Sequence, residues 1–101
     1  KELSRQGSNV RSTVSISFAD AALGTTTSIR TLQGKEELRI PAGTQPGNEF
    51  QMSGKGFPSL NGGGVGDHIV TVIVEVPKRL TRKQKELLEE FKTTKKKSGW
   101  F

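Results

Sequence analysis

Residues 53–67 read Ser-Gly-Lys-Gly-Phe-Pro-Ser-Leu-Asn-Gly-Gly-Gly-Val-Gly-Asp and lead directly into the most apolar run of the chain, residues 68–76. The stretch holds six of the twelve glycines. Because each glycine raises the entropic cost of ordering the backbone, a long loop is predicted here rather than a helix or strand. In a nucleotide-binding loop the glycines follow a strand and open a helix, whereas here they precede a strand. The glycines are therefore interpreted as structural.

The loop is expected to contain left-handed backbone and one side-chain anchor. Positive φ is predicted at Gly54, at Gly56 and at one or more of the four later glycines, which are Gly62, Gly63, Gly64 and Gly66. Asp67, at the entrance to the next strand, is expected to accept backbone amides of the loop before it. Phe57 and Leu60 either cap the edge of the fold or line a shallow apolar patch that accepts an extended peptide, and they are the candidate peptide-binding residues.

The segments before the loop have the periodicity of short strands. Residues 10–18 alternate apolar and polar side chains, which predicts a half-buried strand. Residues 18–23 precede Gly24 and predict one or two helical turns closed by that glycine. Residues 25–32 and 37–40 flank a turn and are expected to pair as a hairpin. Phe50 and Met52 share one face of a further strand.

The segments after the loop predict a central strand and a terminal helix. Residues 69–76 are apolar on both faces, which is typical of a strand covered on both sides, and Pro77 ends it. Thr81 and Gln84 form a capping-box pattern for a helix that runs to about Lys92. Its apolar stripe consists of Leu87, Leu88 and Phe91. Three single phenylalanines are predicted to belong to the core: Phe18, Phe50 and Phe91.

Composition excludes several kinds of function. With 101 residues the chain is long enough for one domain, and it has no cysteine for a disulfide or a thiolate zinc site. The single histidine, His68, cannot hold a metal alone, so neither metal nor cofactor is expected. The acids are scattered, and Asp67 and His68 are neighbours on a strand and point to opposite faces. The chain is predicted not to be an enzyme, and no apolar run is long enough to cross a membrane.

The net charge of +6 lies at one end of the chain. Residues 78–101 hold nine Lys or Arg and three Glu, whereas residues 1–77 hold seven charges of each sign. A nucleic-acid-binding domain usually carries its cations on the folded face, so the excess is interpreted as a solvated helix and tail. Non-specific nucleic-acid binding through that helix and tail remains the alternative, and it would be steeply salt-dependent.

Seven stretches, in a fixed order and spacing, carry a family resemblance over most of the chain. They are residues 14–24 (VSISFADAALG), 31–34 (TLQG), 40–47 (IPAGTQPG), 54–58 (GKGFP), 66–67 (GD), 76–81 (VPKRLT) and 84–91. On these residues the chain resembles the C-terminal substrate-binding region of DnaJ-type co-chaperones, and within it the second C-terminal β-domain. Residues 31–34 run directly into residues 35–40, where a cysteine-rich zinc module interrupts the first domain of many members.

Two residues depart from the family pattern, and two family modules are missing. Arg30 stands where proline is usual and Gln33 where aspartate is usual, so the hairpin turn is expected to differ locally. The chain contains no J-domain with its His-Pro-Asp loop and no zinc module. Because it begins at Lys1 without a methionine, it is expected to be a piece of a longer protein.

The resemblance implies a fold that is mainly β: two small, antiparallel-rich sheets in a sandwich-like arrangement, one short helix and a C-terminal helix. It implies a domain over residues 1–92 and a basic, aromatic tail over residues 93–101 that begins a dimerisation segment. Trp100 and Phe101 are the expected dimer contacts, since large aromatic side chains are costly to leave in water. The alternative is that they dock on the helix of their own chain, near Leu87, Leu88 and Phe91.

The resemblance also implies a function. The domain would bind non-native polypeptides in the cytoplasm, for delivery to a 70-kDa heat-shock chaperone, as half of a V-shaped homodimer. In that family the best-described peptide groove lies in the first β-domain, so the second domain is partly a spacer that sets the angle of the arms.

Overall fold

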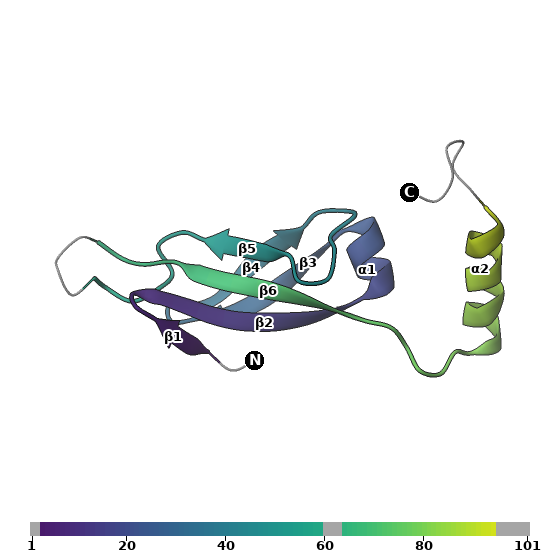
Figure 1. The fold of residues 1–101 in the computed structure, drawn as a ribbon, viewed down its shortest axis with the longest axis horizontal. Coiled ribbons are helices and arrows are strands. Elements are labelled where there is room, and N and C mark those ends of the chain that lie inside the picture. The colour runs from purple at the N-terminus through teal and green to yellow at the C-terminus, as the bar shows by residue number, and fades with distance from the viewer. Residues whose placement is uncertain (1–2, 60–63, 95–101) are drawn as a thin grey trace.

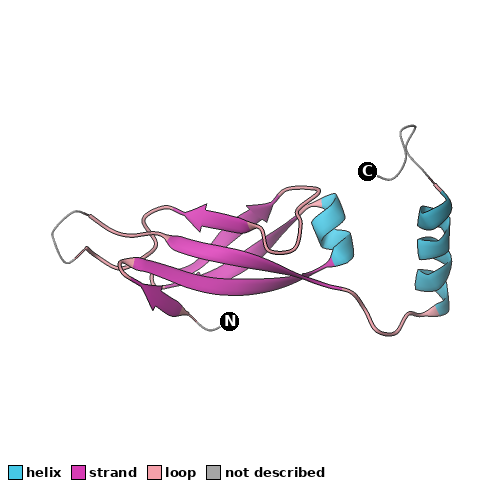
Figure 2. Cartoon of the chain, viewed as in Figure 1, coloured by secondary structure: helices cyan, strands magenta, loops and turns pink. Residues whose placement is uncertain are grey.

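The computed structural model describes residues 3–59 and 64–94 (Figure 1). The elements follow one another as β1 (Ser4–Gln6), β2 (Asn9–Ser17), α1 (Phe18–Leu23), β3 (Thr25–Thr31), β4 (Gly34–Ile40), β5 (Glu49–Met52), β6 (His68–Glu75) and α2 (Arg82–Thr93). The mainly β class predicted from the sequence is confirmed, with the short helix and the C-terminal helix in their expected places (Figure 2).

The main sheet has the strand order β1-β2-β6-β5. Strand β2 runs parallel to β6, from Val10 opposite His68 to Ser17 opposite Glu75. Strands β1 and β5 pair antiparallel with β2 and β6, respectively. Parallel neighbours need a long connection between them. Here that connection contains α1, the second sheet and β5.

The second sheet is the predicted hairpin of β3 and β4, which pair from Thr25 opposite Ile40 to Thr31 opposite Gly34. Helix α1 begins and ends as the sequence predicts. Ser17 accepts a hydrogen bond from the backbone amide of Asp20, and Gly24 follows the last turn with φ of 88°. The carbonyl of Ala21 accepts the amides of Gly43 and Thr44, which fixes the helix to the loop after β4.

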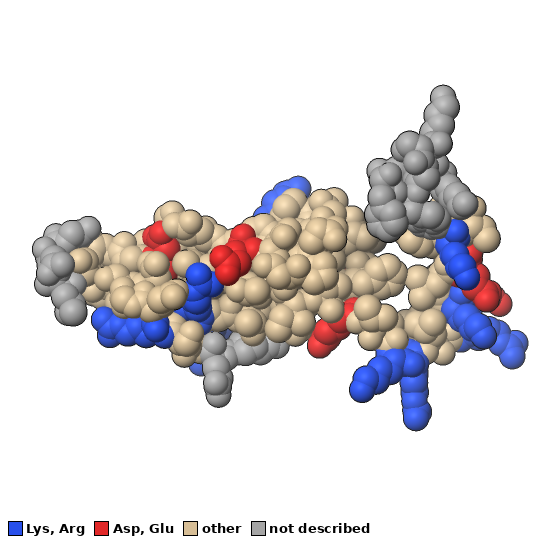
Figure 3. All heavy atoms as spheres, viewed as in Figure 1, with Lys and Arg blue, Asp and Glu red and all other residues tan. Residues whose placement is uncertain are grey.

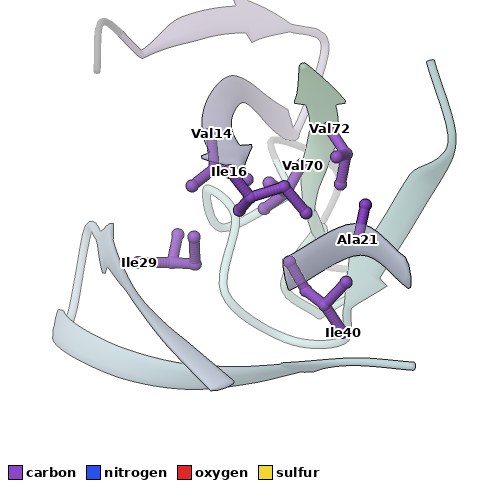
Figure 4. Packing of buried hydrophobic residues seen from close by; sticks show 7 residues of the cluster. All are labelled: Val14, Ile16, Ala21, Ile29, Ile40, Val70 and Val72. Carbon is purple, nitrogen blue, oxygen red and sulfur yellow. The ribbon is translucent and has the colours of Figure 1, made fainter. Parts of the chain in front are cut away.

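The core lies between the two sheets and α1 and is entirely aliphatic (Figure 4). Its buried cluster consists of Val14, Ile16, Ala21, Ile29, Ile40, Val70 and Val72. The prediction that single phenylalanines belong to the core is wrong for Phe91, which is 56% exposed. Phe18 and Phe50 are half-buried. Phe50 packs against the edge of this cluster, whose centre is filled by the β-branched side chains that alternate along β2 and β6.

Strand β6 is central, as predicted, but it is covered on one face only. Val70 and Val72 are buried against the second sheet, whereas Ile73 on the opposite face is 45% exposed. The expectation of cover on both faces is wrong because the second sheet and α1 lie on the same side. Apolar residues on both faces of a strand therefore did not require two covering layers here.

Helix α2 lies apart from the sheets, after the connecting residues 76–81 (Figure 1). The capping box is confirmed: the Thr81 hydroxyl accepts the Gln84 amide at 3.1 Å, and the Gln84 side chain accepts the Thr81 amide at 2.9 Å. No residue of α2 is buried, and Leu87 is 50% exposed. The helix is therefore held by its cap and its own hydrogen bonds more than by packing.

Candidate functional site

The glycine-rich loop uses its glycines in two different ways. Gly54 and Gly64 have φ of 74° and 97°, which confirms the prediction of left-handed backbone. The prediction of positive φ at Gly56 is wrong. A Cβ on Gly56 would lie 2.5 Å from the Ser8 carbonyl oxygen, and one on Gly66 would lie 2.1 Å from it. These two glycines are required because the loop passes against the turn between β1 and β2.

The loop joins both sheets at one end of the molecule. The Phe57 amide donates to the Ser8 carbonyl at 2.8 Å, which ties the loop to the main sheet. The Gln33 side chain donates to the Gly54 carbonyl at 3.0 Å, and Lys55 forms an ion pair of 3.2 Å with Glu36, which ties it to the hairpin. Gln33, a departure from the family pattern, thus has a structural contact of its own.

Asp67 is the side-chain anchor of the loop. One of its carboxylate oxygens accepts the Gly54 amide at 3.0 Å, as predicted, and the other accepts the side-chain amide of Gln51. Its own amide donates to the Asn9 side chain at 2.9 Å. Both carboxylate oxygens are occupied in holding the loop, so Asp67 is a structural residue.

Phe57, predicted as a peptide-binding residue, is half-buried and contacts a cation. The Arg5 guanidinium lies 4.1 Å from the centre of the Phe57 ring, a cation–π contact that covers one face of a half-buried side chain. The other residues predicted for binding or loop geometry, which are Leu60, Gly62, Gly63, Trp100 and Phe101, lie outside the described residues.

The free edge of β2 offers a different binding surface, which sequence reasoning missed. Strand β1 pairs with β2 only as far as Arg11. Within the described residues, which begin at Leu3, residues 12–17 pair on one side, with β6. An unpaired strand edge presents a row of backbone donors and acceptors to another chain. Sequence reasoning did not predict β1, the described strand that pairs with the start of β2.

A groove runs between this free edge and β3, with a volume of about 230 Å³. It is lined by two short runs, residues 12–15 of β2 and residues 27–30 of β3. Val14 and Ile29 belong to the buried core, and the other lining side chains are Ser, Thr and Arg30. The groove therefore combines an unpaired backbone edge with hydroxyl groups and little apolar surface.

A buried histidine lies beside this edge. His68 is fully buried, and its Nε2 lies 2.7 Å from the hydroxyl of Ser12, one of the groove residues. Its Nδ1 is also buried and has no hydrogen-bond partner among the residues that the structure describes. Burial lowers the pKa of His68 below its usual value. The ring is therefore neutral in the folded chain at neutral pH and acts as a packing and hydrogen-bonding residue.

The described part of the chain contains no group of three or more His, Cys, Asp or Glu side chains that could hold a metal ion. In the same part, no helix is long and apolar enough to cross a membrane. What the structure does provide is a small β-rich scaffold in which part of β2 pairs on one side among the described residues.

Comparison with known proteins identifies the family. Residues 1–77 match the family model described as the DnaJ C terminal domain. The chain is 50% identical over 91 residues to the chaperone protein DnaJ of Lacticaseibacillus casei, and the match covers 90% of this chain and 24% of that protein. It is 48% identical over 97 residues to the chaperone protein DnaJ of Picrophilus torridus, covering 96% and 27% of the two chains.

The chain belongs to the DnaJ C-terminal domain family, which confirms the resemblance seen in the sequence. Membership of this chaperone family agrees with the prediction that the chain is not an enzyme. The chain spans about a quarter of the length of the curated relatives it matches.

Proposed function

We propose that this chain is the second C-terminal β-domain of a cytoplasmic DnaJ-type co-chaperone and binds non-native polypeptide at the free edge of β2. The observation that carries the proposal is the one-sided pairing of residues 12–17 beside the groove. An extended client segment would add as a strand to this edge, with main-chain hydrogen bonds supplying the affinity.

The chemistry of the groove suits a weak and sequence-tolerant binder. Backbone pairing does not depend on the identity of the client side chains. The hydroxyl-rich walls offer few apolar contacts, because Val14 and Ile29 are turned into the core. A co-chaperone that passes its client to a 70-kDa heat-shock chaperone has to release it, and modest affinity fits that role.

The binding mode can be tested with a short unfolded peptide and the same peptide methylated on alternate backbone nitrogens. We expect the first peptide to shift the amide resonances of residues 12–17 and 27–30, and the second to lose most of this effect, because a methylated amide cannot donate to a strand. Shifts that persist with the methylated peptide, or that lie elsewhere, would contradict strand addition.

The variant Phe57→Ala is the control that separates the β2 edge from the surface around Phe57. The strand-addition proposal expects this variant to bind the peptide and to suppress aggregation of a denatured client as the parent chain does, since Phe57 lies outside the groove. If binding disappears while the fold is retained, the surface around Phe57 is the site and the β2 edge is not.

The second part of the proposal is that the C-terminal tail contributes to a homodimer through Trp100 and Phe101. Its motive is the apolar surface of these side chains, whose burial is favourable by several kcal/mol at about 25 cal/mol per Å². Sedimentation of the chain and of Trp100→Ala should show a dimer that the substitution weakens. If the parent chain and Trp100→Ala both sediment as monomers at tens of micromolar, the aromatic residues pack within their own chain instead.

A further inference from the structure

Arg30 differs in charge from every other described residue that lines the groove beside β2. The remaining lining residues, in the runs 12–15 and 27–29, carry hydroxyl or aliphatic side chains. The Arg30 side chain is exposed, so it is accessible to a ligand in the groove. Main-chain pairing at the β2 edge does not distinguish one client segment from another, so a preference for particular segments has to come from the lining side chains.

Arg30 lies at one end of the groove. Little more than α1 separates the end of β2 from the start of β3, so β3 starts beside that end and runs back along β2 (Figure 1). Arg30, next to last in β3, therefore lies toward Ser12, and Thr27 lies toward Ser15. Strand β1 pairs with β2 as far as Arg11. The charged residue of the groove is thus at the end next to β1.

Arg30 has no charge partner in the described part of the chain. The residue directly opposite it on β4 is Lys35, so two cations face each other across the hairpin. Like charges directly opposite one another destabilise a strand pair. Glu37, on the same exposed face, lies opposite Ser28, and the ion pairs seen among the described residues do not include Arg30. A carboxylate bound in the groove would therefore offset a repulsion that the free chain retains.

The charge of Arg30 is local and does not belong to a basic face. Residues 1–77 hold seven charges of each sign, and Figure 3 shows blue and red side chains dispersed among uncharged ones over the sheets. A nucleic-acid strand needs a row of cations along its phosphates and aromatic side chains on which its bases stack. The described lining of the groove has one cation and no aromatic residue. Its charge therefore suits a single carboxylate on an extended peptide.

We propose that Arg30 gives the groove a preference for client segments with an acidic side chain at one position of the added strand. The side chains of a strand alternate between its two faces, so every second residue of the client faces β3. At the Ser12 end that residue meets the Arg30 guanidinium, and the next one along meets hydroxyl groups. A carboxylate is favoured at the first position, and a lysine or arginine is disfavoured there.

This inference rests on the proposed function, because it requires strand addition at the β2 edge. It adds a client class that the backbone edge alone does not define. Arg30 stands where proline is usual in the family, and proline has no charge with which to select a client. The preference is therefore expected of chains that carry arginine at this position.

The preference can be tested with three labelled peptides that differ at one central position, which holds glutamate, glutamine or lysine in an otherwise uncharged, strand-forming sequence. Fluorescence anisotropy with the whole chain at low salt should rank their affinities in that order. Because an exposed ion pair is weak, the glutamate peptide should bind on the order of threefold more tightly than the glutamine peptide. Added salt should reduce the differences among the peptides. Equal binding of all three at low salt would overturn the proposal.

Charge reversals test whether Arg30 is the residue responsible. Arg30→Glu should reverse the ranking, so that the lysine peptide binds more tightly than the glutamate peptide. Arg39→Glu is the matched control, because Arg39 lies on the exposed face of β4 and outside the groove. This control should keep the original ranking. The same change in both variants would assign the effect to net charge and overturn the role of Arg30.

Amide resonances separate this proposal from strand addition itself. In Arg30→Gln the glutamine peptide should still shift the resonances of residues 12–17 with its original affinity, whereas the glutamate peptide should lose its advantage. If the glutamate peptide keeps its advantage, Arg30 does not select the client, and strand addition stands. If no peptide shifts residues 12–17 in the parent chain, strand addition fails and the preference fails with it.

Discussion

Gly66 and Gly64 are required for different physical reasons, and substitution by alanine should distinguish them. A Cβ at Gly66 would lie 2.1 Å from the Ser8 carbonyl oxygen, so Gly66→Ala forces two backbone segments apart. We expect a loss of about 2 kcal/mol or more in the free energy of unfolding, measured with urea. At Gly64 the obstacle is φ of 97° with open space around it, so Gly64→Ala should cost about 1 kcal/mol. Equal losses would contradict this distinction.

The buried imidazole of His68 predicts a stability that falls in mild acid. Because burial lowers its pKa, the unfolded chain takes up a proton first, near its ordinary pKa of about 6.5. The stability is complete above that pH and is lost as the pH falls toward the lower pKa of the folded state. Urea midpoints at about pH 8 and about pH 5.5 should therefore differ more for the parent chain than for His68→Gln. The same drop in both would assign the effect to other groups.

At the scale of single residues, the sequence predicted which residues shape the loop better than it predicted the physical reason for each one. It placed Asp67 as the loop anchor because a carboxylate at a strand entrance has backbone amides within reach, and the Gly54 amide is bound as expected. It attributed Gly56 to positive φ, which is wrong. From the sequence, a glycine required for positive φ cannot be told apart from a glycine required for close backbone approach. The Arg5–Phe57 contact was also out of reach, because it joins residues far apart in the chain.

At the scale of elements, α2 should depend on its cap more than on its contacts. Thr81→Ala removes the hydroxyl that accepts the Gln84 amide and should destabilise the helix by about 1 kcal/mol. Hydrogen exchange of the α2 amides should accelerate, while the urea midpoint of the sheets stays unchanged. Thr93→Ala, in the last turn, is the matched control and should leave the exchange of the first turns unaltered. A shift of the global midpoint would show that α2 is coupled to the sheets.

The elements themselves were predictable where local signals specify them. The short helix with its Gly24 terminus, the hairpin and the capping box each depend on neighbouring residues, and each was predicted correctly. The free edge of β2 was not, because it depends on which strand pairs with which and for how long. The exposed face of Ile73 was missed for the same reason: an apolar strand does not reveal how many layers cover it.

At the scale of the whole molecule, two parts differ in charge and in packing. The sheets with α1 enclose the core, and residues 1–77 carry no net charge. The segment from Lys78 to Thr94 carries cations and contains no buried residue. This division agrees with the charge map of the sequence. This division is consistent with the proposal that a client binds to the folded body, at the β2 edge.

The division predicts that the body is stable without the C-terminal segment. A chain that ends at Pro77 keeps every member of the buried cluster, all six strands and α1. Its urea midpoint should match that of the whole chain, because the removed helix contributes no buried side chain. The slope of the transition should also be nearly unchanged, since that slope follows the surface exposed on unfolding and α2 is already solvated. The truncated chain has a net charge of zero, which should lower its solubility near neutral pH. The measurement is therefore made at low protein concentration. A clearly lower midpoint would mean that residues 78–101 support the sheets through contacts beyond those of α2.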